Sequence, residues 1–327
     1  MPDPTRRALV TGIGGQDGSY LAELLVAEGC EVWGVVRNAR GRALPNLAAV
    51  RDRVRLLDGD LLRPATLHAA VVEAAPHELY HLGAPTFVPD SWNDPTSTVE
   101  AIAGGTAAVL AAALAQPEPP RVWVATSSEI YGDAGISPLD ECAPMRPRTP
   151  YGVAKLAAHG LVGAMRAHHG LFACSGITFN HESPRRPERF LPRKVSRAAA
   201  AISLGLQDEL VLGDLRAVRD WSHAADVARA AVLALRHDEP GDYVIASGVG
   251  RTVGELVDVA FARVGLDPAR YIRVDPALSR APEATPPVGD PSKAREVLGW
   301  RPEHSFEDTI AEMVDADLAD LRAAARG

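Results

Sequence analysis

The stretch TGIGGQDG (residues 11–18) follows the short apolar run Ala8–Val10 and leads into a helical pattern that covers Tyr20–Val26. Its glycines are spaced Gly-x-x-Gly-x-x-Gly, at positions 12, 15 and 18. Glycine permits a tight turn and lets a diphosphate approach the backbone N–H groups, and the start of the following helix adds partial positive charge. A strand, this turn and a helix in that order predict a dinucleotide-binding loop. A glycine-rich turn without a ligand is the alternative.

Working outward from this loop, short apolar runs alternate with helical stretches such as Ala101–Gln116. Such alternation indicates an α/β fold, a Rossmann-type doubly wound parallel sheet covered by helices on both faces. The expected strands are Ala8–Val10, Glu31–Val36, Val54–Leu57, Glu78–Leu82 and Arg121–Ala125.

The pattern becomes less regular after about Asn180, where Pro and Arg cluster over residues 184–194 and Pro recurs over residues 276–291. We interpret both clusters as loops of a smaller C-terminal α/β substrate domain. The predicted division is a cofactor domain over residues 1–178 and a mainly substrate-binding domain over 179–327. The chain is expected to rejoin the first domain at about 224–248, where Asp242–Ala246 is predicted as a strand.

Composition restricts the partners and the setting. The formal net charge is -8, which disfavours non-specific nucleic-acid binding because phosphate needs a positive field. The three cysteines lack CxxC spacing, which favours a reducing, cytoplasmic setting. No apolar run reaches the length of a membrane span, and Met1–Arg7 is too short and polar for a signal peptide. We therefore expect no nucleic-acid or membrane partner.

The end of the second strand indicates which dinucleotide is bound. An acid there suits the ribose hydroxyls of NAD, whereas an arginine suits the 2′-phosphate of NADP. The strand is followed by Arg37, with Arg40 and Arg42 close by and no acid. NADP is therefore favoured, and a solvated basic loop is the alternative.

The segment Tyr151-Gly152-Val153-Ala154-Lys155 places a tyrosine and a lysine at i and i+4, on one face of a helix. A neighbouring ammonium favours the phenolate, so we expect the pKa of Tyr151 to be lowered. Such a tyrosine can remove a hydroxyl proton during hydride transfer. A surface pair is the alternative.

Ser127 and Glu129 follow the fifth strand, and residues at the carboxyl ends of parallel strands face the ligand. The Ser127 hydroxyl can bind a substrate hydroxyl. Oxidation alone needs no extra carboxylate, but loss of water needs a base and an acid, and one carboxylate can serve as both. A helix-capping or exposed glutamate is the alternative.

Together these segments resemble the GDP-mannose 4,6-dehydratases of the extended short-chain dehydrogenase/reductase superfamily. The resemblance covers nearly the whole chain. It implies NADP-dependent conversion of GDP-mannose to GDP-4-keto-6-deoxymannose. Its strongest segments are TGIGGQDGSYLAE (11–23), the Ser-Glu and YGVAK elements, FNHESPRR (179–186), AVRDW (217–221) and GDPSKAREVLGW (289–300).

The resemblance also implies residue roles. The implied catalytic residues are Ser127, Glu129, Tyr151 and Lys155. The implied cofactor contacts are Gly12, Ile13, Gly15, Gln16, Asp17, Gly18, Arg37, Asp60, Leu61, Leu82, Gly83, Ala84, Tyr151, Lys155, His181 and Arg186. The implied nucleotide-sugar contacts are Asn180, Lys194, Arg219, Arg280 and Glu283. No metal is implied.

Some positions depart from the family pattern. Ser127 stands where the family has Thr, and Ala84-Pro85-Thr86 replaces Ala-Gln-Ser. The proline of Arg280-Ala281-Pro282-Glu283 is moved by one residue. Asn38 replaces the second arginine of a loop that is short here, and that loop reaches a neighbouring subunit in the family's tetramer. The expected assembly is a homodimer or a homotetramer.

These departures leave other functions open. GDP-4-keto-6-deoxymannose reductases also have a short loop after the second strand and a Ser-Ser-Glu element, whereas His181–Arg186 resembles the dehydratases. A 4,6-dehydratase for another nucleotide sugar is a further alternative. A non-catalytic NADP-binding sensor would keep the glycine loop and lose the Tyr–Lys–Glu set, and this chain has all three.

Overall fold

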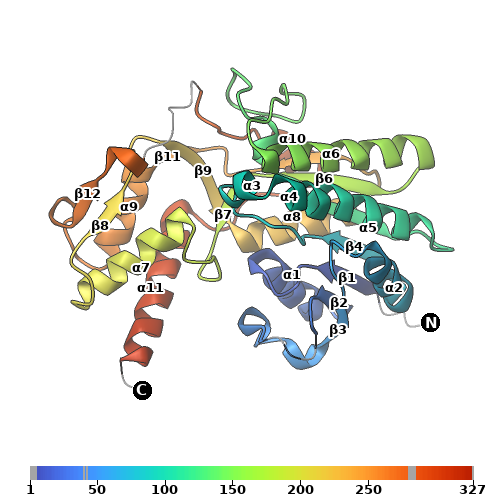
Figure 1. Ribbon diagram of the computed structural model, residues 1–327, viewed down its shortest axis with the longest axis horizontal. Helices are drawn as coiled ribbons and strands as arrows, with labels where there is room; N and C mark the ends of the chain where they lie inside the picture. Colours follow the sequence, from blue (N-terminus) through green and yellow to red (C-terminus); the bar gives the residue numbers. More distant parts are fainter. Residues whose placement is uncertain (1–5, 40, 42, 279–284, 326–327) are drawn as a thin grey trace.

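The computed structural model describes residues 6–39, 41, 43–278 and 285–325. Within these residues, a seven-stranded sheet with the strand order β10-β6-β5-β4-β1-β2-β3 forms the larger part of the molecule (Figure 1). All neighbouring strands in it run parallel. The strands are β1 (Arg7–Thr11), β2 (Glu31–Val36), β3 (Val54–Asp58), β4 (Glu78–His81), β5 (Arg121–Ala125), β6 (Ala173–Thr178) and β10 (Asp242–Ile245).

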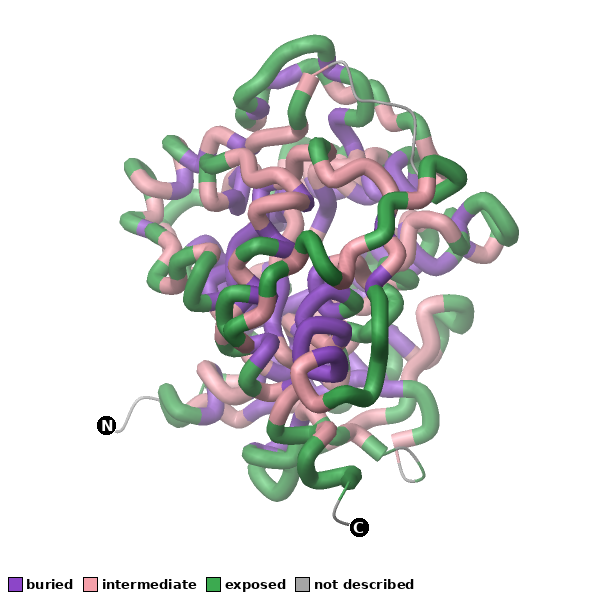
Figure 2. Tube along the Cα trace, turned by 90° about the vertical axis from the view of Figure 1, so that its left-hand side faces the viewer, coloured by how far each residue is buried: buried purple, intermediate pink, exposed green. Residues whose placement is uncertain are grey.

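Helices cover both faces of this sheet. On one face α1 (Gln16–Ala27) packs against α8 (Ala224–Arg236), and on the other face α2 (Pro64–Ala74) and α6 (Pro150–His169) pack against α5 (Gly105–Leu114). Because both faces are covered, the strands carry continuous apolar runs, and Ala8, Leu9 and Val10 of β1 are fully buried. The predicted Rossmann-type doubly wound sheet is thus confirmed. Figure 2 shows the buried segments gathered in the interior and exposed backbone at the periphery.

The helix expected over Ala101–Gln116 begins earlier and changes its winding. The segment runs through α4 (Pro95–Val99) and a π-helical turn (Glu100–Gly104) into α5. Pro95–Leu114 is long and apolar enough to cross a membrane by length and composition, but half of its apolar window is buried inside the protein. A core helix of an α/β protein has the same properties.

The described residues of the smaller unit include three longer helices and two short sheets. In it α7 (Leu191–Ser203) and α9 (Val253–Arg263) pack with α11 (Phe306–Ala324). One sheet has the order β11-β9-β7 and the other pairs β12 with β8. Their strands are β7 (Asn180–Glu182), β8 (Leu210–Leu212), β9 (Val218–His223), β11 (Gly250–Thr252) and β12 (Ile272–Val274).

The prediction of a loop over residues 184–194 is wrong from Leu191 onward, because α7 begins at that residue. Pro192 lies in the first turn of that helix, where the missing N–H costs no hydrogen bond. The remaining short helices are α3 (Asp90–Asn93), α10 (Ser292–Val297) and the 3₁₀ turns Pro45–Leu47, Arg51–Arg53, Ser128–Ile130, Pro268–Arg270 and Pro276–Leu278.

β10 lies at the edge of the large sheet beside β6, although it comes after the first strands of the smaller unit. α8 precedes β10 and packs on the large sheet, and α10 packs beside β10. The chain therefore passes between the two units more than once. These passages bring β7 and the segment before α7 next to the carboxyl edge of the large sheet.

Candidate active site

The glycine loop fits closely against the turn after β4. Gly12 has a φ of +73°, and a Cβ atom added to it would lie 2.8 Å from the Cα of Gly83. A Cβ on Gly18 would lie 2.4 Å from the carbonyl oxygen of Gly12. The Gly83 N–H donates to Thr11 Oγ1 at 3.1 Å, which fixes the two segments to each other. Two predicted cofactor segments, far apart in the sequence, are therefore adjacent, and only glycine fits where they meet.

The first turn of α1 is hydrogen-bonded to the smaller unit. Gln16 Nε2 donates to the carbonyl oxygen of His181 at 3.0 Å, and Ser183 Oγ donates to Gln16 Oε1 at 2.9 Å. Asp17 Oδ2 lies 3.0 Å from His181 Nε2. Burial alone would raise the pKa of Asp17, but His181 and the neighbouring donors lower it to about 2. Burial alone would lower the pKa of His181, yet Asp17 raises it, so the pair is favoured in its charged form.

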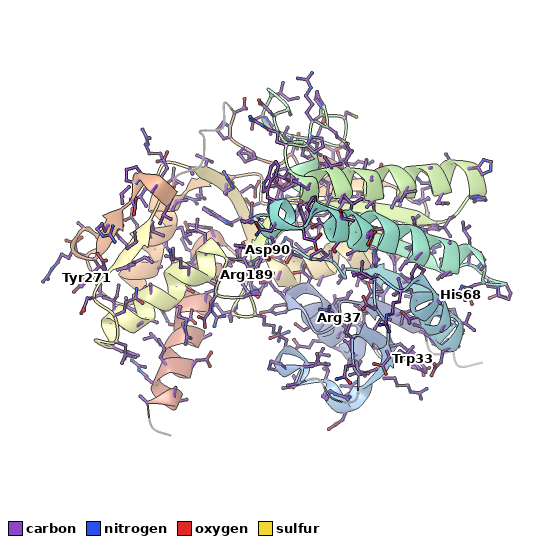
Figure 3. The ribbon with its side chains drawn as sticks, in the orientation of Figure 1. Trp33, Arg37, His68, Asp90, Arg189 and Tyr271 are labelled. Carbon is purple, nitrogen blue, oxygen red and sulfur yellow. The ribbon has the colours of Figure 1, made fainter. Side chains whose placement is uncertain are left out.

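Arg37, after β2, and Asp60 and Leu61, after β3, are among the predicted cofactor contacts. Arg37 directly follows β2 (Figure 3). It is exposed and forms no ion pair within the described part of the chain. Arg40 and Arg42 lie outside the described residues. Leu61 packs against Gly83, next to the glycine loop. Asp58 was not among the residues predicted from the sequence. Its carboxylate accepts a hydrogen bond from the Ala39 N–H at 2.7 Å and so shapes the loop after β2.

Tyr151 and Lys155 lie on the first turns of α6, which is capped by Thr149: its Oγ1 accepts a hydrogen bond from the Gly152 N–H at 2.9 Å. Both side chains are buried, and Lys155 Nζ lies 5.8 Å from the centre of the Tyr151 ring. Lys155 donates to the carbonyl oxygen of Ala125, at the end of β5, at 2.6 Å. Burial lowers the pKa of Lys155 to about 8.

The expected lowering of the Tyr151 pKa is wrong. Burial raises the pKa of Tyr151 to about 12, and a hydrogen bond with Ser127 offsets only part of that shift. The physical reason is desolvation: removing the phenolate from water outweighs the hydrogen bond with Ser127 and the attraction of the Arg186 charge. The Lys155 ammonium donates its hydrogen bond to the carbonyl oxygen of Ala125. The i, i+4 spacing on the helix indicates that the ammonium is near Tyr151 but not where its hydrogen bond goes.

Ser127 and Glu129 are brought beside Tyr151 by a 3₁₀ turn, η4 (Ser128–Ile130). Ser127 Oγ caps this turn by accepting from the Glu129 N–H at 3.2 Å. A Cβ on Gly152 would lie 2.6 Å from the carbonyl oxygen of Glu129, so the glycine of the Tyr-Gly-x-x-Lys segment lets η4 pack on α6. The charge of Glu129 is close enough to raise the pKa of Tyr151. A hydroxyl, a carboxyl and a phenol therefore share one site.

His81, which no sequence motif indicated as a site residue, lies next to this site. His81 ends β4, is buried, and its Nδ1 lies 2.8 Å from Thr11 Oγ1. Burial, with a smaller contribution from Lys155, lowers the pKa of His81 to about 3. The imidazole is therefore neutral at physiological pH and adds a polar but uncharged group next to Lys155.

The residues predicted to bind the nucleotide sugar are only partly described. Asn180 and Arg219 lie on the adjacent strands β7 and β9. Lys194 on α7 donates to the carbonyl oxygen of Val211 at 2.9 Å. Arg280 and Glu283 lie outside the described residues.

Asp220, next to Arg219, was not predicted from the sequence, because its hydrogen-bond partners are distant in the chain. Its buried carboxylate accepts from the backbone N–H groups of Ser247, Gly248 and Gly289 at 2.8, 3.0 and 3.1 Å. It therefore fastens the loop after β10 and the loop before α10 to β9.

Two cavities of about 340 and 1060 Å³ lie elsewhere. The larger one lies at the amino ends of β1, β4 and β5, between Arg6, Glu78 and Arg121. We place the candidate site at the opposite edge, because parallel sheets bind ligands at the carboxyl ends of their strands and because the titratable groups converge there.

Comparisons with known proteins show which family this chain resembles. The family model described as GDP-mannose 4,6 dehydratase matches residues 9–313. GDP-mannose 4,6 dehydratase 2 of Arabidopsis thaliana is 39% identical over 97% of this chain and 88% of its own length. GDP-mannose 4,6-dehydratase of Sinorhizobium fredii (strain HH103) is 40% identical over 96% of this chain and 97% of its own length.

Solved structures share the fold. A putative epimerase from Burkholderia cenocepacia superposes with a TM-score of 0.85 at 28% identity, covering 97% of this chain and 99% of its own. RMD from Pseudomonas aeruginosa, solved with NADPH, superposes with a TM-score of 0.81 at 26% identity, covering 97% and 98%.

Proposed function

The chain belongs to the GDP-mannose 4,6-dehydratase family of hydro-lyases, and we propose that it converts GDP-mannose to GDP-4-keto-6-deoxymannose with NADP as a permanently recycled cofactor. One observation carries the proposal: the Tyr151 phenol is hydrogen-bonded to the Ser127 side chain and lies close enough to the Glu129 carboxylate for that charge to raise the pKa of the phenol. Oxidation at carbon 4 needs the last two groups, and removal of water needs a third that can both take and give a proton.

The residues at the carboxyl edge of the large sheet fit a dinucleotide. The close approach of Gly12 to Gly83 leaves backbone N–H groups at the start of α1 for a diphosphate. Arg37 is exposed at the end of β2, where it would hold the 2′-phosphate. We assign the remaining predicted cofactor contacts, including Arg186 and Lys155, to the same ligand. Bound there, NADP⁺ would supply a hydride acceptor for carbon 4 and return that hydride to carbon 6.

The residues of the chain would handle the protons. Tyr151 takes the proton of the 4-hydroxyl, which Ser127 holds in place by a hydrogen bond. The resulting ketone acidifies the proton on carbon 5, and Glu129 takes it. Glu129 then protonates the departing 6-hydroxyl, and water leaves. Glu129 takes up a proton from solvent and delivers it to carbon 5, while Tyr151 releases to solvent the proton that it took from the 4-hydroxyl. Lys155 keeps a positive charge beneath the tyrosine, which stabilises negative charge as it develops on the phenol oxygen.

The setting remains a proposal. We expect a cytoplasmic enzyme that acts as a homodimer or homotetramer and binds neither nucleic acid nor a membrane. We likewise propose the division into a cofactor domain over residues 1–178, rejoined at about 224–248, and a mainly substrate-binding domain over 179–327.

The test is the product formed by the purified protein. With GDP-mannose and no added NADPH, we expect a product lighter by one water, identified by mass spectrometry. A related reductase, which the Ser127-Ser128-Glu129 element also suits, would leave GDP-mannose unchanged and consume NADPH when given the 4-keto sugar. That second result would refute the proposal.

A further inference from the structure

Two segments that flank the candidate site are joined by an ion pair. Asp90 begins α3, in the segment after β4, and Arg189 lies in the segment between β7 and α7. Their side chains meet with Arg189 Nη1 2.8 Å from Asp90 Oδ2. Figure 3 shows the two residues side by side where the larger and smaller units meet. An exposed pair of this kind contributes little by itself, so its neighbours matter.

Those neighbours are aromatic rings. Phe87 and Phe190 pack edge to face, with ring centres 5.3 Å apart and planes at 88°. The guanidinium of Arg189 lies 4.4 Å from the centre of the Phe87 ring. Edge-to-face rings and a cation over a ring face are both favourable beyond simple burial. Two residues from each segment thus form one contact set, which we call the clasp: Phe87, Asp90, Arg189 and Phe190.

The clasp also holds Arg186. The Arg186 guanidinium lies 3.7 Å from the centre of the Phe190 ring, and its Nε lies 3.2 Å from Glu182 Oε2. Within the described residues the guanidinium makes no other ion pair and no hydrogen bond, although the side chain is only 15% exposed. An arginine held on two sides, with its outer nitrogens unengaged, is prepared for an anionic ligand. Of the two contacts that hold Arg186, the one with Phe190 belongs to the clasp, and the clasp extends to Phe87 and Asp90 of the larger unit.

We propose that the clasp positions Arg186 on an anionic group of the bound dinucleotide and slows release of that cofactor. The inference rests on the proposed function, in which the cofactor is regenerated in every cycle and need not leave. Phe190 acts as a positioning residue through Arg186, and Phe87, Asp90 and Arg189 keep Phe190 in place. Opening the clasp separates the two segments that flank the cofactor contacts Ala84 and His181.

The rate of cofactor release tests this without reference to turnover. The full-length protein is loaded with NADPH and mixed with excess NADP⁺, and the loss of bound-NADPH fluorescence gives the dissociation rate. Phe190→Ala should raise that rate about tenfold, and Arg189→Ala about threefold, the size expected from loss of one ring contact or one cation–ring contact. Phe190→Tyr keeps the ring and should release NADPH at the wild-type rate.

Two further variants complete the design. Arg263→Ala removes an exposed arginine that is paired with Asp315 and lies away from the site, so release should stay at the wild-type rate. Phe87→Ala combined with Phe190→Ala should accelerate release by less than the product of the single effects, because each ring needs the other.

Wild-type release rates in Phe87→Ala and Arg189→Ala, with wild-type melting temperatures, would overturn the clasp even if Phe190→Ala failed to fold. If those rates were unchanged while GDP-mannose was still converted, the proposed function would stand and only the clasp would fall. If the unmutated protein bound no NADPH, both the cofactor assignment and the clasp would be refuted.

Discussion

The carboxylate of Asp17 and the imidazole of His181 lie 3.0 Å apart, joining the first turn of α1 to β7 across more than half of the chain. Gln16, the neighbour of Asp17, bonds the same strand through the His181 carbonyl oxygen. The glycine loop is therefore fastened to the smaller unit as well as to its own sheet. This arrangement makes the loop's geometry depend on a charged pair that titrates.

Replacement of Asp17 by Asn should lower stability in a pH-dependent way. The folded-state pKa of Asp17 is lowered from 3.8 to about 2, so its contribution is present above pH 3.8 and is lost as the pH falls toward 2. The raised pKa of His181 acts in the opposite sense, so its contribution fades as the pH rises through that value. The loss in unfolding free energy should be about 2 kcal/mol at most near pH 5. Urea unfolding between pH 3 and 8 measures it, with the exposed Asp52→Asn as control.

Arg37→Ala should weaken NADP⁺ binding about tenfold or more while leaving NAD⁺ binding little changed, because it removes a charge-assisted contact to a group that only NADP⁺ carries. Titration calorimetry with both nucleotides measures the two affinities. The exposed Arg51→Ala controls for general loss of positive charge. Equal affinities of the unmutated protein for the two nucleotides would contradict the assignment.

Glu129→Gln should reduce turnover of GDP-mannose by about a hundredfold or more, because shape is kept and proton transfer is not. Binding of the nucleotide sugar should persist. In single-turnover experiments with bound NADP⁺, this variant should still show transient NADPH absorbance, whereas Tyr151→Phe should show none. Near-normal turnover by Glu129→Gln would remove the carboxyl from the mechanism.

Lys155→Met should abolish activity and yet stabilise the protein at pH 7. Burial lowers the folded-state pKa of Lys155 from 10.5 to about 8, so the unfolded chain binds more protons between these values and wild-type stability rises with pH across that window. The gain in the variant should be about 3 kcal/mol at most at pH 7 and should disappear near pH 11. Thermal unfolding at both pH values checks this, with Lys293→Met as a matched control.

Local sequence features predicted much of this architecture. The apolar runs of β1 to β5 indicated buried parallel strands, and the glycine spacing indicated a turn whose close contact with Gly83 the structure displays. Ser127 and Glu129 were expected to face the ligand because they follow the fifth strand. The structure shows that Tyr151 lies near them, in the first turn of the helix that the same connection leads into. Their roles remain predictions for the experiments above.

Features that depend on distant partners were not predictable in this way. Asp58 and Asp220 act on backbone groups that only the folded chain brings near them. The pKa of Tyr151 was misjudged because spacing on a helix reveals a neighbouring charge but not the depth of burial. The start of α7 is not predictable from the proline cluster, because proline is typical of loops and is also tolerated in a first helical turn, where Pro192 lies.

The central claim is that one site both oxidises carbon 4 and reduces carbon 6 with the same hydride. GDP-mannose deuterated at carbon 4, incubated with the purified protein and no added NADPH, should give a 4-keto-6-deoxy sugar that carries the deuterium on carbon 6. Mass spectrometry of the product locates the label, and an absorbance trace shows whether NADPH accumulates. Unlabelled GDP-mannose in deuterated water should take up deuterium at carbon 5. Unconverted GDP-mannose, with steady loss of NADPH when the 4-keto sugar is supplied, would contradict the account.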